Sequence, residues 1–403
     1  MHQATLAWQV YELTGSALSL ASVGGVRFVA QLIGSIFGGA VADTADRGKT
    51  VVLAQLVPIL ITSILVLLTA SKSANLPIIL AVVVLLGVAN AFENPARQAL
   101  LPQLVRRETF QIAVATSSTI QQLSFALGPM TAGITIAAMG VEGAYAITVG
   151  LTAASAVLIA FARPVYPMVT RAGGLSLTMV KEGLQFVWRK QPVIGAMALD
   201  TVAVIFAGAQ ALLPIYAQDI LMVGPEGFGI LNSSQGIGAF AMSCALLFLP
   251  QIQRTGRALV LTVAMFGVAT LVFAVSRDFT LSVVAYALTG AFDQISVVMR
   301  QTIIQMGTPD ELRGRVSAVN QVFIGAANQL GALHVGSVTQ LTGSATIALV
   351  YGGIGCLVGI TALAFKLPEL WNHDVRQDAD DREAEAIAAA KALLDKRAPM
   401  EAG

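Results

Sequence analysis

Several ionisable side chains lie within long apolar stretches of this sequence: Arg27, Glu93, Asp200, Asp293 and His334. A charge inside a lipid bilayer is costly unless it is paired or hydrated, so each position is a candidate for binding a charged ligand or a proton. A basic side chain suits an anionic ligand. A lone buried carboxylate suits proton transfer, because burial favours its neutral form.

Two of these positions lie deep inside predicted helices. Arg27 lies about 15 Å into a helix that begins near Ala17, by helical rise. It could bind an anionic substrate in a central cavity, or it could pair with Glu12. Asp200 lies roughly 12 Å into a helix that begins near Pro192. It could carry a proton, or it could line a wet cytoplasmic vestibule.

The other three positions have open interpretations as well. An Ala-Phe-Glu sequence ending at Glu93 recurs as Ala-Phe-Asp ending at Asp293, and an Arg-Gln pair at Arg97 recurs at Arg300. We expect each carboxylate to pair with the arginine of its own repeat, with proton coupling as the alternative. His334 could titrate near neutrality or serve as a core histidine bonded to a carbonyl group.

The composition indicates an integral membrane protein. Hydrophobic residues make up 56% of the 403 positions and charged residues only 12%, and the mean hydropathy is +0.75. A soluble domain has about 25% charged residues. The two cysteines, Cys244 and Cys356, each lie inside an apolar run, so no disulfide framework or metal-binding spacing is evident.

The apolar runs predict an all-α fold of twelve membrane-spanning helices. A span needs about 20 apolar residues. The run before Gly15 has only about 15 and is too short. We therefore expect a native start upstream of Met1, or a truncated product. The other predicted spans are 17–41, 50–70, 77–99, 111–139, 144–162, 192–217, 228–249, 258–276, 280–301, 316–341 and 345–366.

Basic residues concentrate on one side of this predicted topology. By the positive-inside rule, that side and both termini are cytoplasmic. The opposite side carries only Lys72 and Arg277. The basic set is Arg47, Lys49, Arg97, Arg106, Arg107, Arg163, Arg171, Lys181, Arg189, Lys190, Arg254, Arg257, Arg300, Arg313, Arg315 and Lys366.

The repeats and spans divide the chain into four predicted parts. These are an N-terminal six-helix bundle at 1–163, a cytoplasmic linker at 164–191, a C-terminal six-helix bundle at 192–367 and a polar tail at 368–403. The linker has Leu184 and Val187 on one helical face, which predicts an amphipathic helix on the membrane surface with Trp188 at the interface. In the tail, 378–397 is predicted to be a soluble helix.

The loop after the second predicted span carries Gly39, Asp43, Arg47 and Lys49. These residues resemble the signature loop of major facilitator superfamily transporters, G-x-x-x-D-[RK]-x-G-[RK]-[RK]. Three positions of the loop depart from that pattern, namely Thr44, Asp46 and Gly48.

Further stretches resemble one branch of that superfamily, the drug:proton antiporters that include enterobactin exporters and macrolide-efflux proteins. The stretches are 90–102 and 309–316. Gly128, Pro129 and Gly133 also resemble the glycine-proline motif of antiporters. Pro129 is expected to bend its helix, and Gly133 to allow close packing.

The resemblance implies two pseudo-symmetric halves, a substrate site near the membrane midplane and alternating access. It favours proton-coupled export of small amphipathic compounds by a monomer in the inner membrane, with membrane lipid, protons and a small-molecule substrate as partners. The alternatives are uptake or lipid transport by the same fold, or a non-transporting scaffold or sensor. We expect no enzymatic activity, no cofactor, no metal and no nucleic-acid partner.

The family also implies a cytoplasmic latch at Asp43. The alternative is a solvated turn that only obeys the positive-inside rule. If Asp43 is a latch, Asp43→Asn should abolish export while the amount of protein in the membrane stays at the wild-type level. Efflux measurements with quantified membrane expression check this outcome. Unchanged export by a well-expressed variant would reject the latch.

Overall fold

The computed structural model describes residues 1–44, 46–162, 177–250 and 252–374, and every regular element in these ranges is helical. The predicted helix at 378–397 and the first part of the linker lie outside the described residues. The first helices are α1 (His2–Thr14), α2 (Ala17–Thr44), α3 (Arg47–Ala70), α4 (Leu76–Leu104), the short 3₁₀ turn η1 (Arg107–Thr109) and α5 (Phe110–Phe161).

The later helices begin after the linker. They are α6 (Leu177–Arg189), α7 (Gln191–Ala207), η2 (Ala209–Leu212), α8 (Leu213–Ile215), η3 (Tyr216–Ile220), α9 (Gly224–Leu246), α10 (Thr255–Val275), α11 (Phe279–Met306), α12 (Asp310–Thr342), α13 (Ala345–Lys366) and α14 (Pro368–Trp371). Eight helical segments of the described chain are long and apolar enough to cross a membrane.

Short polar residues mark the helix starts. Asp46 caps α3 by accepting a hydrogen bond from the Lys49 backbone N–H at 3.1 Å. Asn75, Asp278 and Ser344 cap α4, α11 and α13 in the same way. These caps satisfy backbone donors that have no partner within the helix, so the turns between the apolar runs also fix where each helix begins.

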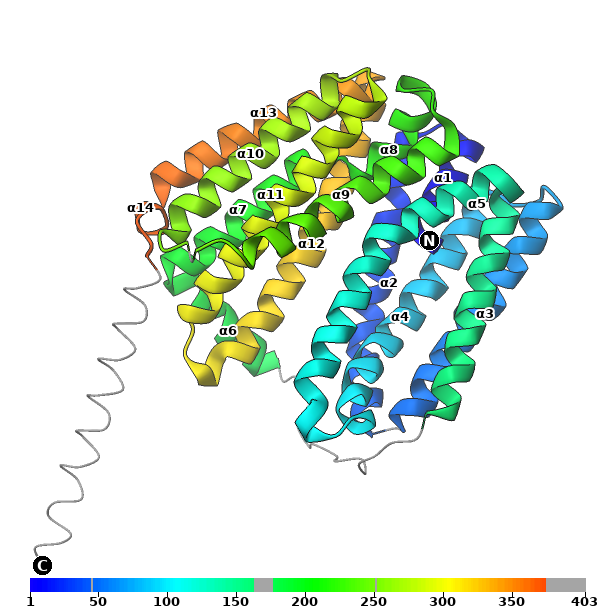
Figure 1. Cartoon of the computed structure of the whole chain (residues 1–403), viewed down its shortest axis with the longest axis horizontal. Helices are drawn as coiled ribbons and strands as arrows, with labels where there is room; N and C mark the ends of the chain where they lie inside the picture. The colour runs from blue at the N-terminus through cyan, green and yellow to red at the C-terminus, as the bar shows by residue number, and fades with distance from the viewer. Residues whose placement is uncertain (45, 163–176, 251, 375–403) are drawn as a thin grey trace, which may run out of the picture.

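A single residue divides the long helix α5. Gly140 has φ 75° and ψ 177°, a conformation that favours glycine, and it lies between the predicted spans 111–139 and 144–162. Figure 1 shows α5 as two limbs that meet at a bend. The turn predicted between these two spans is therefore present.

The span predicted at 192–217 lies within one candidate membrane span, Gln191–Ile220, but its helix is interrupted. α7 ends at Ala207, and Gly208 takes a non-helical conformation with ψ 89°. The chain then continues through the short turn η2, the single turn α8 and the π-helix η3. Pro214 provides no N–H, so the sequence contains a local cause of the irregular stretch that follows Ala207.

The helices before residue 162 pack mainly on one another, as do those after residue 190. In the first group α2 contacts α4, and α3 contacts both α4 and α5. In the second group α11 contacts α9 and α10, and α7 contacts α12 and α13. The main contacts between the groups are α5 with α9 and α2 with α12. Figure 1 shows the groups meeting at the upper edge and separating below.

Glycines allow the close contact between α5 and α9. A Cβ atom on Gly133 would lie 2.4 Å from the Pro225 carbonyl oxygen and 2.7 Å from the Gly229 Cα atom. A Cβ atom on Gly229 would lie 2.9 Å from the Pro129 carbonyl oxygen. The two backbones therefore approach more closely than any larger residue would permit.

The amphipathic helix α6 packs on protein rather than lying freely on the membrane. Val187 is fully buried in a cluster that includes Val316 of α12. The Glu182 carboxylate forms an ion pair with Arg315. Trp188 is exposed. The predicted amphipathic character is present, but α12 covers part of the apolar face, because the start of α12 has apolar side chains of its own.

The beginning of the predicted polar tail also packs on the helices. Leu370 of α14 is fully buried among side chains of α7 and α10. The Arg257 guanidinium lies over the Trp371 ring at 5.7 Å, and the Thr255 hydroxyl is 2.9 Å from Nδ1 of His373. The polar tail predicted at 368–403 therefore begins as a packed segment.

The glycine contact generates a stability prediction. Gly133→Ala should destabilise the protein by about 1–3 kcal/mol, because the new methyl group would meet backbone atoms that cannot move aside. Thermal unfolding of the detergent-solubilised protein measures the effect. Gly150→Ala in the same helix is the matched control, since nothing lies within 4 Å of its Cβ position. Equal melting temperatures for the two variants would contradict the prediction.

Candidate functional site

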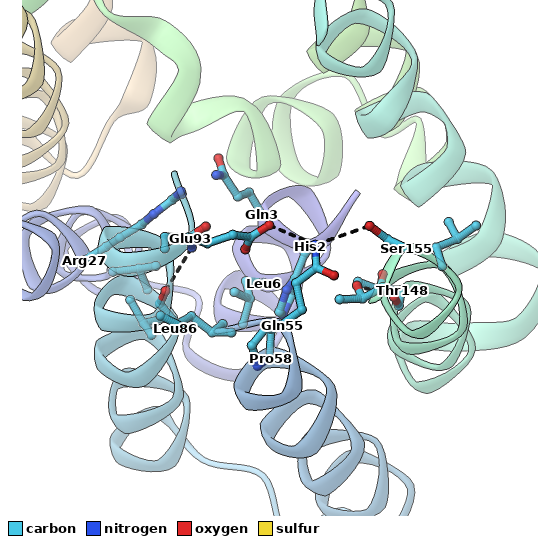
Figure 2. A pocket seen from close by; sticks show the side chains of 16 residues that line it. His2, Gln3, Leu6, Arg27, Gln55, Pro58, Leu86, Glu93, Thr148 and Ser155 are labelled. Atoms are coloured by element: carbon cyan, nitrogen blue, oxygen red, sulfur yellow. Dashed lines mark hydrogen bonds between the residues drawn. The ribbon is translucent and has the colours of Figure 1, made fainter. Parts of the chain in front are cut away.

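A cavity of about 410 Å³, lined by both polar and apolar side chains, lies among the helices before residue 162. Figure 2 shows its wall, in which Arg27, Glu93 and Gln55 come from three different helices. The lining residues are His2, Gln3, Leu6, Val23, Arg27, Gln55, Pro58, Val83, Leu86, Ala89, Asn90, Glu93, Thr148, Leu151, Thr152 and Ser155.

Gln55 organises the polar side of this cavity. Its Nε2 atom donates to Oε1 of Glu93 at 3.0 Å and to the Ser155 hydroxyl oxygen at 3.3 Å, as Figure 2 shows. Its Oε1 atom is buried and accepts no hydrogen bond from the described residues. The amide therefore links α3 to α4 and to the second limb of α5, and it retains one unused acceptor.

The predicted pair of Glu93 with Arg97 is not formed. Arg97 is exposed and lies 3.5 Å from the Asn94 side-chain oxygen, whereas Glu93 accepts from Gln55. The residues lie one turn apart on α4, but their side chains reach different surroundings. Glu93 lines the cavity, whereas Arg97 reaches solvent, which stabilises its charge without a carboxylate partner among the described residues.

Arg27 lies in the cavity wall, as Figure 2 shows. No ion pair joins it to Glu12 or to any other residue in the described ranges. Glu12 is exposed in the last turn of α1, next to the connection to α2, whereas Arg27 lies well inside α2. Of the two alternatives drawn from the sequence, the pair with Glu12 is absent, and the guanidinium faces a space that could hold an anionic group.

Asp200 and Arg300 form a buried ion pair between α7 and α11. The exposed fractions of the two residues are 6% and 3%. Asp200 is therefore not a lone carboxylate, and Arg300 does not pair with Asp293 as the repeats predicted. The repeats compare positions along one helix, whereas the partner of Arg300 comes from a neighbouring helix that packs against it.

His334 lies away from the cavity, in an aromatic cluster. Its ring centroid is 5.2 Å from that of Phe206 and 5.8 Å from that of Tyr351. Its Nε2 atom is buried with no hydrogen-bond partner in the described chain. This packing differs from the expected core histidine whose ring bonds to a carbonyl group.

Polar side chains are also exposed at membrane depth. Gln31 of α2, Gln121 and Gln122 of α5 and Asn328 of α12 are exposed. Amide groups in contact with hydrocarbon would be costly. We therefore infer that these helix faces contact water and not lipid. Gln210 is exposed too, whereas Asn320 is buried.

The signature loop is described only in part. The side chains of Gly39, Asp43 and Arg47 lie outside those that the structure describes. Lys49 is exposed, and its backbone N–H donates to Asp46. The carboxylate that caps the start of α3 is that of Asp46.

Residues 1–398 match the family model described as transmembrane secretion effector. The chain belongs to this family. The match covers nearly the whole sequence, and it agrees with the resemblance to major facilitator superfamily transporters carried by the loop and helix motifs. This secretion effector is therefore a multi-pass membrane protein of a transporter superfamily.

Three characterised relatives are similar to this secretion effector over most of its length. The staphyloferrin A transporter of Staphylococcus aureus is 27% identical, over 79% of this chain and 80% of that protein. The multidrug efflux pump Tap of Mycolicibacterium fortuitum is 25% identical, over 91% of each. The enterobactin exporter EntS of Salmonella choleraesuis is 26% identical, over 89% and 80%.

Solved transporter structures share the fold of this secretion effector. The nucleoside transporter NupG superposes with a TM-score of 0.69, over 92% of this chain and 97% of that chain, at 12% identity. A POT family transporter in complex with a thioalcohol-conjugated peptide gives 0.68, over 92% and 93%, at 11% identity. At such low identity the likeness concerns the fold alone.

The sequence reasoning missed several polar residues of the cavity. Gln55, Ser155, Thr148 and Thr152 line it together with Arg27 and Glu93. Gln55 could have been found, because it is the only strongly polar side chain between Thr50 and Thr62. The hydroxyl residues carried no such signal, since serine and threonine commonly bond to their own helix backbone, as Thr148 does to Ala144.

The Gln55 network generates a second stability prediction for this secretion effector. Gln55→Met keeps the shape of the side chain but removes the donor shared by Glu93 and Ser155. The variant should unfold with a free energy lower by about 1–3 kcal/mol, because buried polar groups lose their partner. The exposed Gln122→Met is the matched control. Thermal unfolding in detergent tests the difference, and a wild-type melting temperature for Gln55→Met would refute it.

Proposed function

We propose that this protein is a secondary active transporter that exports small amphipathic compounds, such as drugs or a siderophore, in exchange for protons. The observation that carries the proposal is a cavity with a guanidinium and a carboxylate, set among the membrane-spanning helices of a secretion family. Relatives named as an enterobactin exporter and a multidrug efflux pump support this substrate range.

The proposed architecture has twelve spans in two pseudo-symmetric halves. Besides the eight apolar segments, it counts the second limb of α5 and the helices α1, α9 and α12 as spans. Helices α9 and α12 contact α5 and α2. Both carry polar residues that suit a water-filled path better than lipid. α1 is counted as the first span. The halves are 1–163 and 192–367, joined by the linker at 164–191 and followed by the tail at 368–403.

The proposed orientation places both termini and the basic connections in the cytoplasm, with the protein in the inner membrane. The contacts between the two groups of helices support a cavity that opens to the cytoplasm, because these contacts lie at the opposite end of the helices. Gly133 meets Gly229, and Gly336 approaches Ala21, on the helix portions remote from the basic connections. The Tyr11 hydroxyl donates to Asp219 at the same end. The exposed amides Gln121 and Gln122 lie nearer the basic side.

In this proposal the protein alternates between a form open to the cytoplasm and a form open to the other side of the membrane. The change separates the glycine contacts and closes the cytoplasmic end. The loop with Gly39, Asp43, Arg47 and Lys49 is the cytoplasmic latch. Gly128 and Pro129, where the helix is proposed to bend, precede the Gly133 contact that must open. Arg27 and Glu93 bind substrate in the cavity. The protein acts as a monomer in lipid, without cofactor, metal or nucleic acid, and performs no catalysis.

Export assays test this function directly. A deletion strain and an overexpressing strain should differ in export of antibiotics or secreted siderophores, and a protonophore should abolish the difference. Arg27→Gln should reduce export at least about tenfold, the factor that corresponds to about 1.4 kcal/mol. The exposed Glu12→Gln is the matched control and should export normally. Export that persists after the gradient collapses would exclude proton exchange.

A further inference from the structure

The helix α6 has one exposed side that carries basic and aromatic residues. Lys181, Gln185, Trp188 and Arg189 occupy positions i, i+4, i+7 and i+8 of this helix, so they lie on the same side of it. All four side chains are exposed, and Trp188 has 66% of its surface exposed. We call these four residues the basic face of α6.

The opposite side of α6 is fixed on α12. Val187 is fully buried in a cluster with Val316. A Cβ atom on Gly183 would lie 3.0 Å from the carbonyl carbon and oxygen of Arg315, so the two helices are in close contact there. Because one side of α6 is held against protein, the basic face is turned away from α12.

The end of α6 lies at the boundary of a membrane span. α6 ends at Arg189, Lys190 is the N-cap of α7, and α7 begins at Gln191 without an intervening loop. Gln191 is also the first residue of a segment long and apolar enough to cross a membrane. Trp188 therefore precedes that span by three residues, which places the end of the basic face at the depth of the lipid headgroups.

The residue types of the basic face suit that depth. Tryptophan is enriched at membrane–water interfaces, and long basic side chains reach from apolar surroundings to the headgroups. Within residues 181–190, Trp188 is the only exposed aromatic or large aliphatic side chain, because Leu184 and Phe186 are half-buried and Val187 is buried. A face with a single such residue rests among headgroups and does not insert into hydrocarbon.

The basic face has a surplus of positive charge. Lys181 and Arg189 belong to it, and the exposed Lys190 directly follows it. These side chains extend to the same membrane boundary, where basic residues attract anionic lipids. A zwitterionic headgroup offers no net charge for them to neutralise.

Two carboxylates lie near this surface and leave the surplus in place. Glu182 forms an ion pair with Arg315, so its charge is already balanced. Glu369 is close to the start of α7, because its backbone N–H donates to Oε1 of Gln191 at 3.0 Å. Three cations on or next to the basic face thus stand against one further carboxylate.

We infer that the basic face of α6, with Lys190, docks on the headgroups of anionic phospholipids. The Lys181 ammonium and the Arg189 guanidinium bind phosphate oxygens, and Trp188 lies between the headgroups. Figure 1 shows α6 at the lower end of the second group of helices, where the two groups have separated. Since α6 is fixed on α12, this docking ties the start of α12 to the membrane surface.

Fluorescence quenching tests whether the basic face meets lipid. The full-length protein is placed in nanodiscs of phosphatidylcholine with phosphatidylglycerol, and the emission of Trp188 is taken as the difference between wild type and Trp188→Phe. A spin label on a lipid headgroup should quench this emission strongly, and iodide in the water phase only weakly. Strong quenching by iodide without quenching by the headgroup label would overturn the inference, because the face would then meet water or a soluble partner.

Thermal unfolding in mixed micelles tests the preference for anionic lipid. Phosphatidylglycerol should raise the melting temperature of the wild-type protein, and high salt should reduce this gain by screening. In the double variant Lys181→Gln with Arg189→Gln, the phosphatidylglycerol fraction needed for the half-maximal gain should rise at least about fivefold, the change expected for loss of one basic contact.

A double variant of the exposed residues Lys72 and Arg106, Lys72→Gln with Arg106→Gln, is the matched control. It removes the same charge away from α6 and should respond to phosphatidylglycerol almost as the wild type does. An equal loss of response in the control would overturn the inference, and so would an equal gain from phosphatidylcholine. The same gain from glycerol 3-phosphate without added lipid would assign the site to soluble phosphates instead. No measurement uses a transported compound, so failure of the proposed export would leave this inference standing.

Discussion

Hydrocarbon offers no hydrogen bonds, so every polar group on a membrane-spanning helix must find a protein partner or reach water. This constraint explains the internal organisation of the protein. Gln55 holds Glu93 beside a cavity, and Asp200 neutralises Arg300 between two helices. Where the described part of the chain offers no hydrogen-bond partner, as for Gln121 and Gln122, the side chains are exposed on a face that suits water. The polar residues therefore mark the interior path as clearly as the apolar ones mark the lipid surface.

Close packing between helices is the second constraint on this structure. The two groups of helices touch where glycine lets their backbones approach, as at Gly133 and Gly229. Such a contact gains dispersion energy without any polar bond, so it can separate without exposing unpaired groups to lipid. The polar contacts of Gln55 and Arg300, in contrast, lie within one group or the other, whereas the Tyr11–Asp219 hydrogen bond joins the two groups at the same end as the glycine contacts. This division suits a protein that rocks between two arrangements while each group stays internally bonded.

Much of the fold could be predicted because hydrophobic runs and turn residues are local signals. Ala17 begins α2 as expected, and the turn near Gly140 separates the two limbs of α5. The break after Ala207 was missed, although Gly208 and Pro214 were visible, because the surrounding residues remain apolar. Burial decided that α6 packs on α12, and helical periodicity alone does not distinguish a protein surface from a lipid surface.

The sequence by itself determined the environment, the family and the candidate charges, because composition, periodicity and short motifs are properties of contiguous residues. Only the tertiary structure decided the partners. Arg300 joins Asp200 instead of Asp293, and Glu93 joins Gln55 instead of Arg97. Spacing along one helix tells which side chains share a face. Which neighbouring helix that face meets depends on the packing of segments far apart in the chain.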